Sequence, residues 1–202
     1  MFIKEPNPNL PRVTEILRAT ESEEARDRLR KWQHKMDKIH GPGGADLASQ
    51  EAREKGTHFH TYIEQFIDSG IEPQMPTEEQ ERWNAGREII QAFKPHIYAC
   101  ELGIQSTVLG YRGTLDALAF PNCPQVIDWK TSKRVKRESW IEDYKLQVTA
   151  YAIAAKEMGI RIQGAQIIIF SPKRCQRFIV DIEHYTPQWL ERLERYKTTI
   201  AA

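Results

Sequence analysis

The hydrophobic pattern of this 202-residue chain changes its period near residue 95, and that change narrows the possible folds more than any other feature. Before it, apolar residues recur at helical spacing. After it, short runs rich in β-branched and aromatic residues alternate with turn residues. We therefore expect a helical part over about 1–94 and a sheet core over about 95–202. The length favours a single α/β domain over 1–202, with the helical part as a layer on the sheet.

Apolar spacing and turn residues place the individual elements. One early helix carries an apolar stripe, Leu29, Trp32, Met36 and Ile39, and the glycines of 41–44 end it. Further helices are expected over 45–68, 77–93 and 140–158, and from Thr186-Pro187 onward. Strands are expected over 98–108, 111–120, 125–130, 165–170 and 178–182.

Charge and cysteine content limit the kinds of partner. The net charge is +1, so attraction to nucleic acid must come from local basic patches. The three cysteines are too few for the four thiolates of a usual iron–sulfur cluster, and their odd number favours a reducing cytoplasm over a disulfide framework. No run approaches the roughly 18 apolar residues of a membrane helix, and no targeting signal is visible. We therefore expect a cytoplasmic protein with no iron–sulfur cluster and no membrane partner.

The segment Val126-Ile127-Asp128-Trp129-Lys130 holds the first candidate site. Alternate residues of a strand share a face, so Asp128 and Lys130 project together while Trp129 points to the other side. The pair alone leaves two interpretations open. It belongs either to an active centre or to an exposed cross-strand ion pair, which is common and contributes little to stability.

The preceding strand favours the active centre. Asp116 lies inside an apolar segment, and a short turn joins its strand to that of Asp128, so the two strands can pair as a hairpin. Two carboxylates brought together in partly buried surroundings repel each other unless a proton or a cation lies between them. Mg²⁺ is the common solution, held by one or two carboxylates and by phosphate oxygens of a substrate.

Two helical pairs extend this candidate site. His60 and Glu64 are four residues apart, as are Gln147 and Tyr151, so each pair shares one helix face. The alternative for His60 is an ordinary histidine of an amphipathic helix. The chain has no His-Glu-x-x-His run that would indicate zinc.

Taken in order, these motifs resemble those of the RecB-type branch of the PD-(D/E)XK nuclease superfamily. The likeness rests on Gly56-Thr57-His58-Phe59-His60 with Glu64, Gly113-Thr114-Leu115-Asp116, Ile127-Asp128-Trp129-Lys130-Thr131-Ser132 and Leu146-Gln147 with Tyr151. The segments 10–17, 30–36 and 189–193 resemble the mitochondrial genome maintenance exonuclease family. The chain lacks the mitochondrial presequence of that family, which favours a bacterial or bacteriophage relative.

The resemblance implies a restriction-endonuclease-like fold, with a mixed central sheet flanked by helices, and a role for each candidate residue. Asp116 and Asp128 would bind Mg²⁺ or Mn²⁺, and His60 and the carbonyl of Trp129 would be further ligands. Lys130 would orient the attacking water and stabilise charge on the phosphate. Glu64, Gln147 and Tyr151 would support the site.

Basic residues cluster just after the candidate catalytic strand. Lys133, Arg134 and Lys136 lie beside the predicted metal site, which favours phosphate binding over a merely solvated loop. The hydroxyls of Thr131 and Ser132 could bind the phosphate next to the scissile one. In the resembled family the N-terminal helices help to enclose single-stranded DNA. Trp32, Phe59 or Tyr62 could stack on its bases, although core packing is the favoured interpretation for each.

We therefore expect a monomeric exonuclease that uses Mg²⁺ or Mn²⁺ to degrade single-stranded DNA from free ends, in replication, repair, recombination or phage-directed DNA degradation. A structure-specific endonuclease of the same superfamily is the enzymatic alternative. A non-catalytic DNA-binding module is the other alternative. Such relatives usually lose an aspartate or the lysine, whereas Asp116, Asp128 and Lys130 are all present here.

Overall fold

The computed structural model describes residues 5–120 and 122–201, and these residues form a five-stranded sheet of order β1-β2-β3-β4-β5. The strands are β1 (Ile97–Ser106), β2 (Tyr111–Ala119), β3 (Gln125–Thr131), β4 (Gly164–Ser171) and β5 (Arg174–Val180). β3 and β4 are parallel, and the other neighbouring strands are antiparallel. The predicted α/β fold with a mixed central sheet is therefore confirmed.

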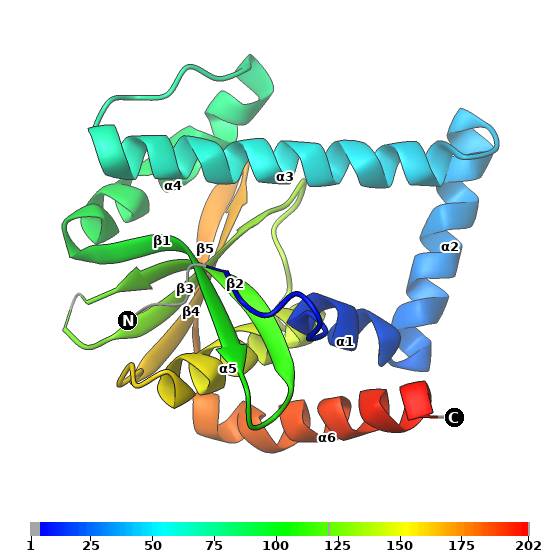
Figure 1. Ribbon diagram of the computed structural model, residues 1–202. Helices are drawn as coiled ribbons and strands as arrows, with labels where there is room; N and C mark the ends of the chain where they lie inside the picture. Colours follow the sequence, from blue (N-terminus) through cyan, green and yellow to red (C-terminus); the bar gives the residue numbers. More distant parts are fainter. Residues whose placement is uncertain (1–4, 121, 202) are drawn as a thin grey trace.

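Helices cover both faces of the sheet (Figure 1). They are α1 (Val13–Ala19), α2 (Glu23–His40), α3 (Gly44–Ser69), α4 (Thr77–Phe93), α5 (Glu142–Glu157) and α6 (Ile182–Ala201), with the short 3-10 turns η1 (Lys94–His96) and η2 (Glu138–Trp140). α3 and α4 pack on one face, and α1, α5 and α6 pack on the other. Among the described helices, none has the length and hydropathy needed to span a bilayer.

The alternation of β3 divides the molecule into two apolar cores. Ile127 and Trp129 pack with Phe59 of α3 and Trp83 of α4. Val126 packs with residues of α5 in the other core. Asp128 and Lys130 share the face of Val126, opposite Trp129, as the strand period predicts.

The sheet opens in its middle, between β2 and β3. These strands pair only at Ala117↔Ile127, Leu118↔Val126 and Ala119↔Gln125. Beyond these pairs β2 continues along β1, and β3 continues along β4. The two strands therefore diverge just where Asp116 and Asp128 lie.

Two elements begin four residues earlier than predicted. α6 begins at Ile182, not at Thr186, because the carboxylate of Asp181 accepts hydrogen bonds from the amides of Glu183 and His184. β5 begins at Arg174 rather than at residue 178. β5 is an edge strand, and its first residues are mostly polar. The apolar alternation that predicts a strand is therefore absent there.

α2 is the exception to the burial pattern. Although its apolar stripe has helical spacing, no residue of α2 is buried. Leu29, Trp32 and Ile39 are 44%, 37% and 57% exposed. A turn leads from α2 into α3, and in it Gly41 and Gly43 have φ angles of 83° and 84°, which disfavour any residue with a side chain. α2 extends along the side of the molecule, from the neighbourhood of α1 and α6 to the start of α3 (Figure 1).

Candidate active site

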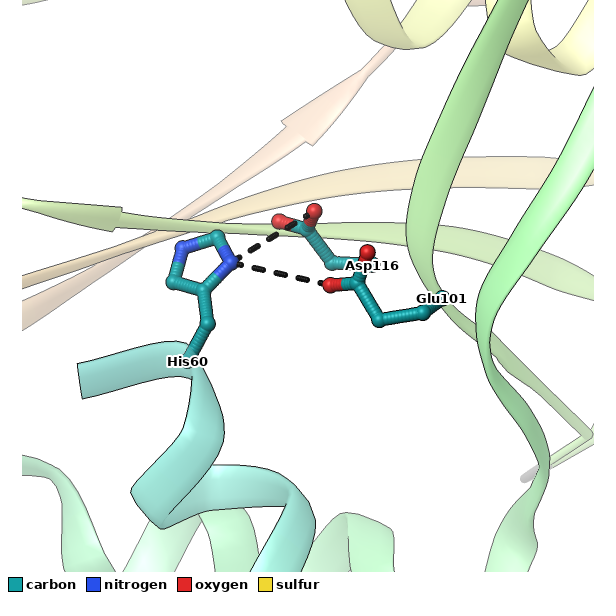
Figure 2. Close-up of side chains that lie close together, drawn as sticks. All are labelled: His60, Glu101 and Asp116. Carbon is teal, nitrogen blue, oxygen red and sulfur yellow. Dashed lines mark ion pairs between the residues drawn. The ribbon is translucent and has the colours of Figure 1, made fainter. Parts of the chain in front are cut away.

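Three side chains from three elements converge where β2 and β3 diverge (Figure 2). Nδ1 of His60, on α3, lies 3.7 Å from Oδ1 of Asp116 on β2 and 3.9 Å from Oε1 of Glu101 on β1. One potential ligand atom of each residue lies within 4.8 Å of the other two. An imidazole nitrogen and two carboxylates form a donor set that suits a divalent cation.

The histidine is oriented by the backbone of β3. Nε2 of His60 lies 2.9 Å from the carbonyl oxygen of Trp129. When Nε2–H donates to that carbonyl, the lone pair of Nδ1 faces the two carboxylates, an arrangement usual for metal-binding histidines. Burial lowers the pKa of His60, but the neighbouring carboxylates of Glu101 and Asp116 outweigh burial and raise it. The Trp129 carbonyl, expected as a metal ligand, is thus a hydrogen-bond partner of His60.

Asp116 has the most perturbed carboxyl group of the site. Burial and the neighbouring charge of Asp128 raise its pKa to about 7. The amide of Trp129 donates a hydrogen bond to its Oδ2, at 2.6 Å. The negative charge of ionised Asp116 is therefore poorly compensated by its surroundings, and a bound cation would compensate it.

Asp128 and Lys130 form a partly buried ion pair, so the interpretation as an exposed ion pair is wrong. Asp128 is fully buried. Nζ of Lys130 lies 2.9 Å from Oδ1 and 2.7 Å from Oδ2 of Asp128, and it lies 5.2 Å from the centroid of the Tyr144 ring. Burial opposes the charge of Lys130, but Asp128 and Asp116 outweigh burial and raise its pKa, so the ammonium group stays protonated.

The predicted supporting residues flank this centre. Nε2 of Gln147 donates to the hydroxyl of Tyr151 at 2.8 Å. A Cβ atom at Gly113 would lie 2.5 Å from the Tyr151 ring, so this contact requires glycine. Glu64 is not one of the three convergent residues. Burial and the charge of Glu101 raise the pKa of Glu64.

Glu101 was not singled out from the sequence. It lies opposite Asp116 in the β1–β2 ladder, between the pairs Cys100↔Ala117 and Leu102↔Leu115. Its φ of 47° is the only positive value among described non-glycine residues, a strained conformation typical of functional sites. The available signal was its position as the single carboxylate in β1.

The predicted DNA-binding residues line a cavity of about 440 Å³ near the site. One wall is formed by the end of β3 and the loop after it, with Thr131, Ser132, Lys133, Arg134 and Lys136. The facing wall includes Trp32 and Met36 of α2. Both the amide and the carbonyl of Lys136 hydrogen-bond the side chain of Gln176, which anchors the loop to β5.

The three aromatic candidates for base stacking have different surroundings. Phe59 is fully buried, and Tyr62 packs against the same core, as their core interpretation predicted. For Trp32 that interpretation is wrong, because Trp32 is exposed and lines the cavity. The positive charge of α2 is partly neutralised, since Arg26 and Arg30 pair with acidic residues of the same helix.

A sequence profile described as the PD-(D/E)XK nuclease superfamily matches residues 87–202, more than half of the chain. The chain belongs to the PD-(D/E)XK nuclease superfamily. The diverging strands that carry Asp116, Asp128 and Lys130 lie within the matched region of this superfamily member. No curated protein sequence matches the chain significantly. The RecB-type branch and the mitochondrial relative therefore stay predictions.

Solved structures provide a fold comparison. The crystal structure of SSO0001 is similar with a TM-score of 0.53 and 14% identity, over 96% of this chain and 78% of that one. At this identity the likeness supports the fold alone. An alkaline exonuclease from Laribacter hongkongensis gives a TM-score of 0.39 at 13% identity, over 70% and 78% of the two chains. A phage-related exonuclease from Haemophilus somnus 129PT gives 0.42 at 12% identity, over 100% and 96%.

Proposed function

We propose that this protein is a Mg²⁺- or Mn²⁺-dependent deoxyribonuclease that removes nucleotides from free ends of single-stranded DNA. One observation carries the proposal. In a member of a nuclease superfamily, His60, Glu101 and Asp116 converge beside the partly buried ion pair of Asp128 and Lys130. Such a reaction suits replication, repair, recombination or phage-directed DNA degradation. Residues 1–202 would carry it out as one monomeric nuclease domain.

The residues of the site fit a divalent cation. His60, Glu101 and Asp116 would hold it, with Asp128 as a further candidate ligand, and the carbonyl of Trp129 would orient the ring of His60. The raised pKa of Asp116 is the expected behaviour of a ligand set whose negative charge exceeds its positive charge. When bound, such a cation polarises the phosphate and lowers the pKa of water.

Lys130 has a separate part in the reaction. Asp128 keeps it charged and holds it in place, so its ammonium group can donate to phosphate oxygens as negative charge develops on them. A donor that is already oriented needs no reorganisation during the reaction, which makes it effective in catalysis. Gln147 and Tyr151, which hydrogen-bond each other, would support the site beside Lys130.

The cavity between α2 and the loop after β3 supports a preference for single strands. Its two walls differ, because Trp32 and Met36 offer an aromatic and apolar surface while Lys133, Arg134 and Lys136 offer positive charge. A single strand presents stackable bases and phosphates at the same time, whereas a duplex keeps its bases inside. α2 connects α1 to α3 at the side of the molecule (Figure 1). A DNA strand that passes through the cavity between α2 and the loop after β3 is therefore expected to enter by an end.

Linear and covalently closed single strands test the proposal. With Mg²⁺, the wild-type protein should degrade end-labelled linear strands and spare closed circles. Blocking the 5′ or the 3′ end shows the polarity. Equal cleavage of circles would contradict the exonuclease proposal and favour an endonuclease. DNA binding without any metal-dependent cleavage would favour a non-catalytic DNA-binding module.

A further inference from the structure

A second, smaller cavity lies beside the candidate active site, between the segment before α1 and the first half of β2. Its volume is about 240 Å³, and its lining includes Arg12, Thr14, Arg112, Thr114 and Tyr151. Sites for drug-sized ligands usually measure about 300–1,000 Å³. The smaller volume suits a single phosphate group better than a whole nucleotide.

The lining is rich in hydrogen-bond donors, and none of the described residues that form it carries a carboxylate. The Arg112 side chain is held in place, because it donates to the carbonyls of Leu10 and Pro8 at 2.8 and 3.2 Å. The side chains of Arg12, Thr14 and Thr114 make no hydrogen bond or ion pair with another described residue. A guanidinium group and hydroxyls without partners, in a lining free of acidic residues, select an anion.

The edge of β2 adds a main-chain donor. The amide of Arg112 donates to the carbonyl of Pro11 at 2.9 Å, so this side of β2 faces the segment before α1. Amides two residues apart in a strand point toward the same edge, so the amide of Thr114 points there too. Thr114 lies beyond the end of the β2–β3 ladder, and no described strand pairs with it on that edge.

Tyr151 links the cavity to the residues that flank the candidate active site. Tyr151 lines the cavity, and its hydroxyl accepts a hydrogen bond from Gln147. Thr114 precedes Asp116 by two residues of the same strand, or about 7 Å. That separation is comparable to the spacing of neighbouring phosphates in an extended nucleic-acid strand.

We propose that this cavity binds one of the two phosphate groups that flank the scissile one, with Arg12 as its main charged partner, while Thr131 and Ser132 in the larger cavity would face the other. The inference rests on the proposed nuclease function and makes it more specific. The bound phosphate is a terminal phosphomonoester if the strand ends there, or an internal phosphodiester if the strand continues.

Binding without cleavage tests this site, using fluorescence anisotropy of labelled single-stranded oligonucleotides in the presence of EDTA. Arg12→Ala should weaken binding about tenfold or more, because a charge-assisted hydrogen bond is lost. Arg18→Ala is the matched control. It removes the same charge from an exposed arginine of α1 that does not line the cavity, so it should change binding little. Thermal melting of both variants checks that they fold.

Two sets of probes separate the sources of the phosphate. If the phosphate is terminal, wild-type protein binds strands with a 5′- or 3′-phosphate more tightly than strands with hydroxyl ends, and Arg12→Ala loses this difference. If it is internal, one neutral methylphosphonate linkage weakens wild-type binding, and Arg12→Ala adds no further loss on that strand.

The site is contradicted if the Arg12→Ala and Arg18→Ala variants bind every probe alike. It is also contradicted if Arg12→Ala weakens binding by the same factor whether or not the strand carries a terminal phosphate, and whether its linkage is charged or neutral. Phosphate-dependent binding through Arg12 without cleavage in Mg²⁺ would instead contradict the proposed nuclease function and leave this site standing.

Discussion

α2 and α5 are helices of similar length in opposite surroundings. Ten of the sixteen residues of α5 are buried, because it lies between the sheet and two other helices. None of the eighteen residues of α2 is buried. Its apolar residues Trp32 and Met36 face a cavity whose other wall is basic. An apolar stripe therefore indicates that one side of a helix meets a partner, but not that the partner is the protein core.

In the proposed function, residues of the sheet and α5 carry out the cleavage, and α2 contacts the substrate. Asp128→Asn would disrupt the cleavage. It should lower the cleavage rate by about 10³-fold or more, because both the proposed metal site and the anchor of Lys130 are lost. Single-turnover cleavage of a labelled strand measures this. Asp46→Asn, at an exposed aspartate of α3, is the control and should cleave normally. An Asp128→Asn variant with more than a tenth of wild-type activity would remove Asp128 from the mechanism.

The same substitution in both helices tests the difference in burial directly. Leu146→Ala in α5 should cost about 2–5 kcal/mol of unfolding free energy, because it opens a cavity in the core. Leu29→Ala in α2 should change stability by no more than about 0.5 kcal/mol. Urea unfolding monitored by circular dichroism gives both values. Similar losses for the two variants would mean that α2 packs as tightly as α5.

Trp32 should matter for binding and not for stability. Trp32→Ala is expected to weaken binding of single-stranded DNA by about 1–3 kcal/mol, the usual contribution of one stacked base. Trp32→Phe keeps an aromatic surface and should retain most of the affinity. Anisotropy titrations compare the variants, and duplex DNA of the same sequence serves as the control. Unchanged affinity in Trp32→Ala would leave the apolar stripe of α2 without a nucleic-acid partner.

The raised pKa of Asp116 makes a smaller and pH-dependent prediction. Its pKa is raised from 3.8 to about 7, so the metal-free folded protein holds this proton more tightly than the unfolded chain does. Stability without metal should therefore fall as pH rises between these values. At about pH 8 in EDTA, Asp116→Asn should melt higher than wild type, by about 2–4 °C for each kcal/mol relieved. Mn²⁺ should raise the melting temperature of wild type only, and an equal rise in the variant would argue against Asp116 as a ligand.

The repetitive parts of this structure were predictable from the sequence. Alternation along β3 placed Asp128 and Lys130 on one face, and helical spacing located α3 with His60 on it. These inferences depend only on local periods, which side chains impose directly. The predicted strand boundary failed at β5, where polar residues of an edge strand hide the period.

Contacts that depend on register could not be predicted. Glu101 reaches the site because β1 pairs with β2 in one particular alignment, and its sequence neighbours give no sign of that pairing. The small cavity at Arg12 requires residues about 100 positions apart in the chain to meet. The exposure of Trp32 follows from the position of α2 outside both cores, which spacing along a helix does not specify.

Metal-dependent cleavage by the centre at the diverging strands is tested most directly with one end-labelled linear single strand. We expect wild-type protein to cleave it with Mg²⁺ or Mn²⁺, to stop when EDTA is added, and to resume when the metal is restored. Undiminished cleavage in EDTA, or no cleavage with either metal, would contradict a metal-dependent nuclease built on Asp116, Asp128 and Lys130.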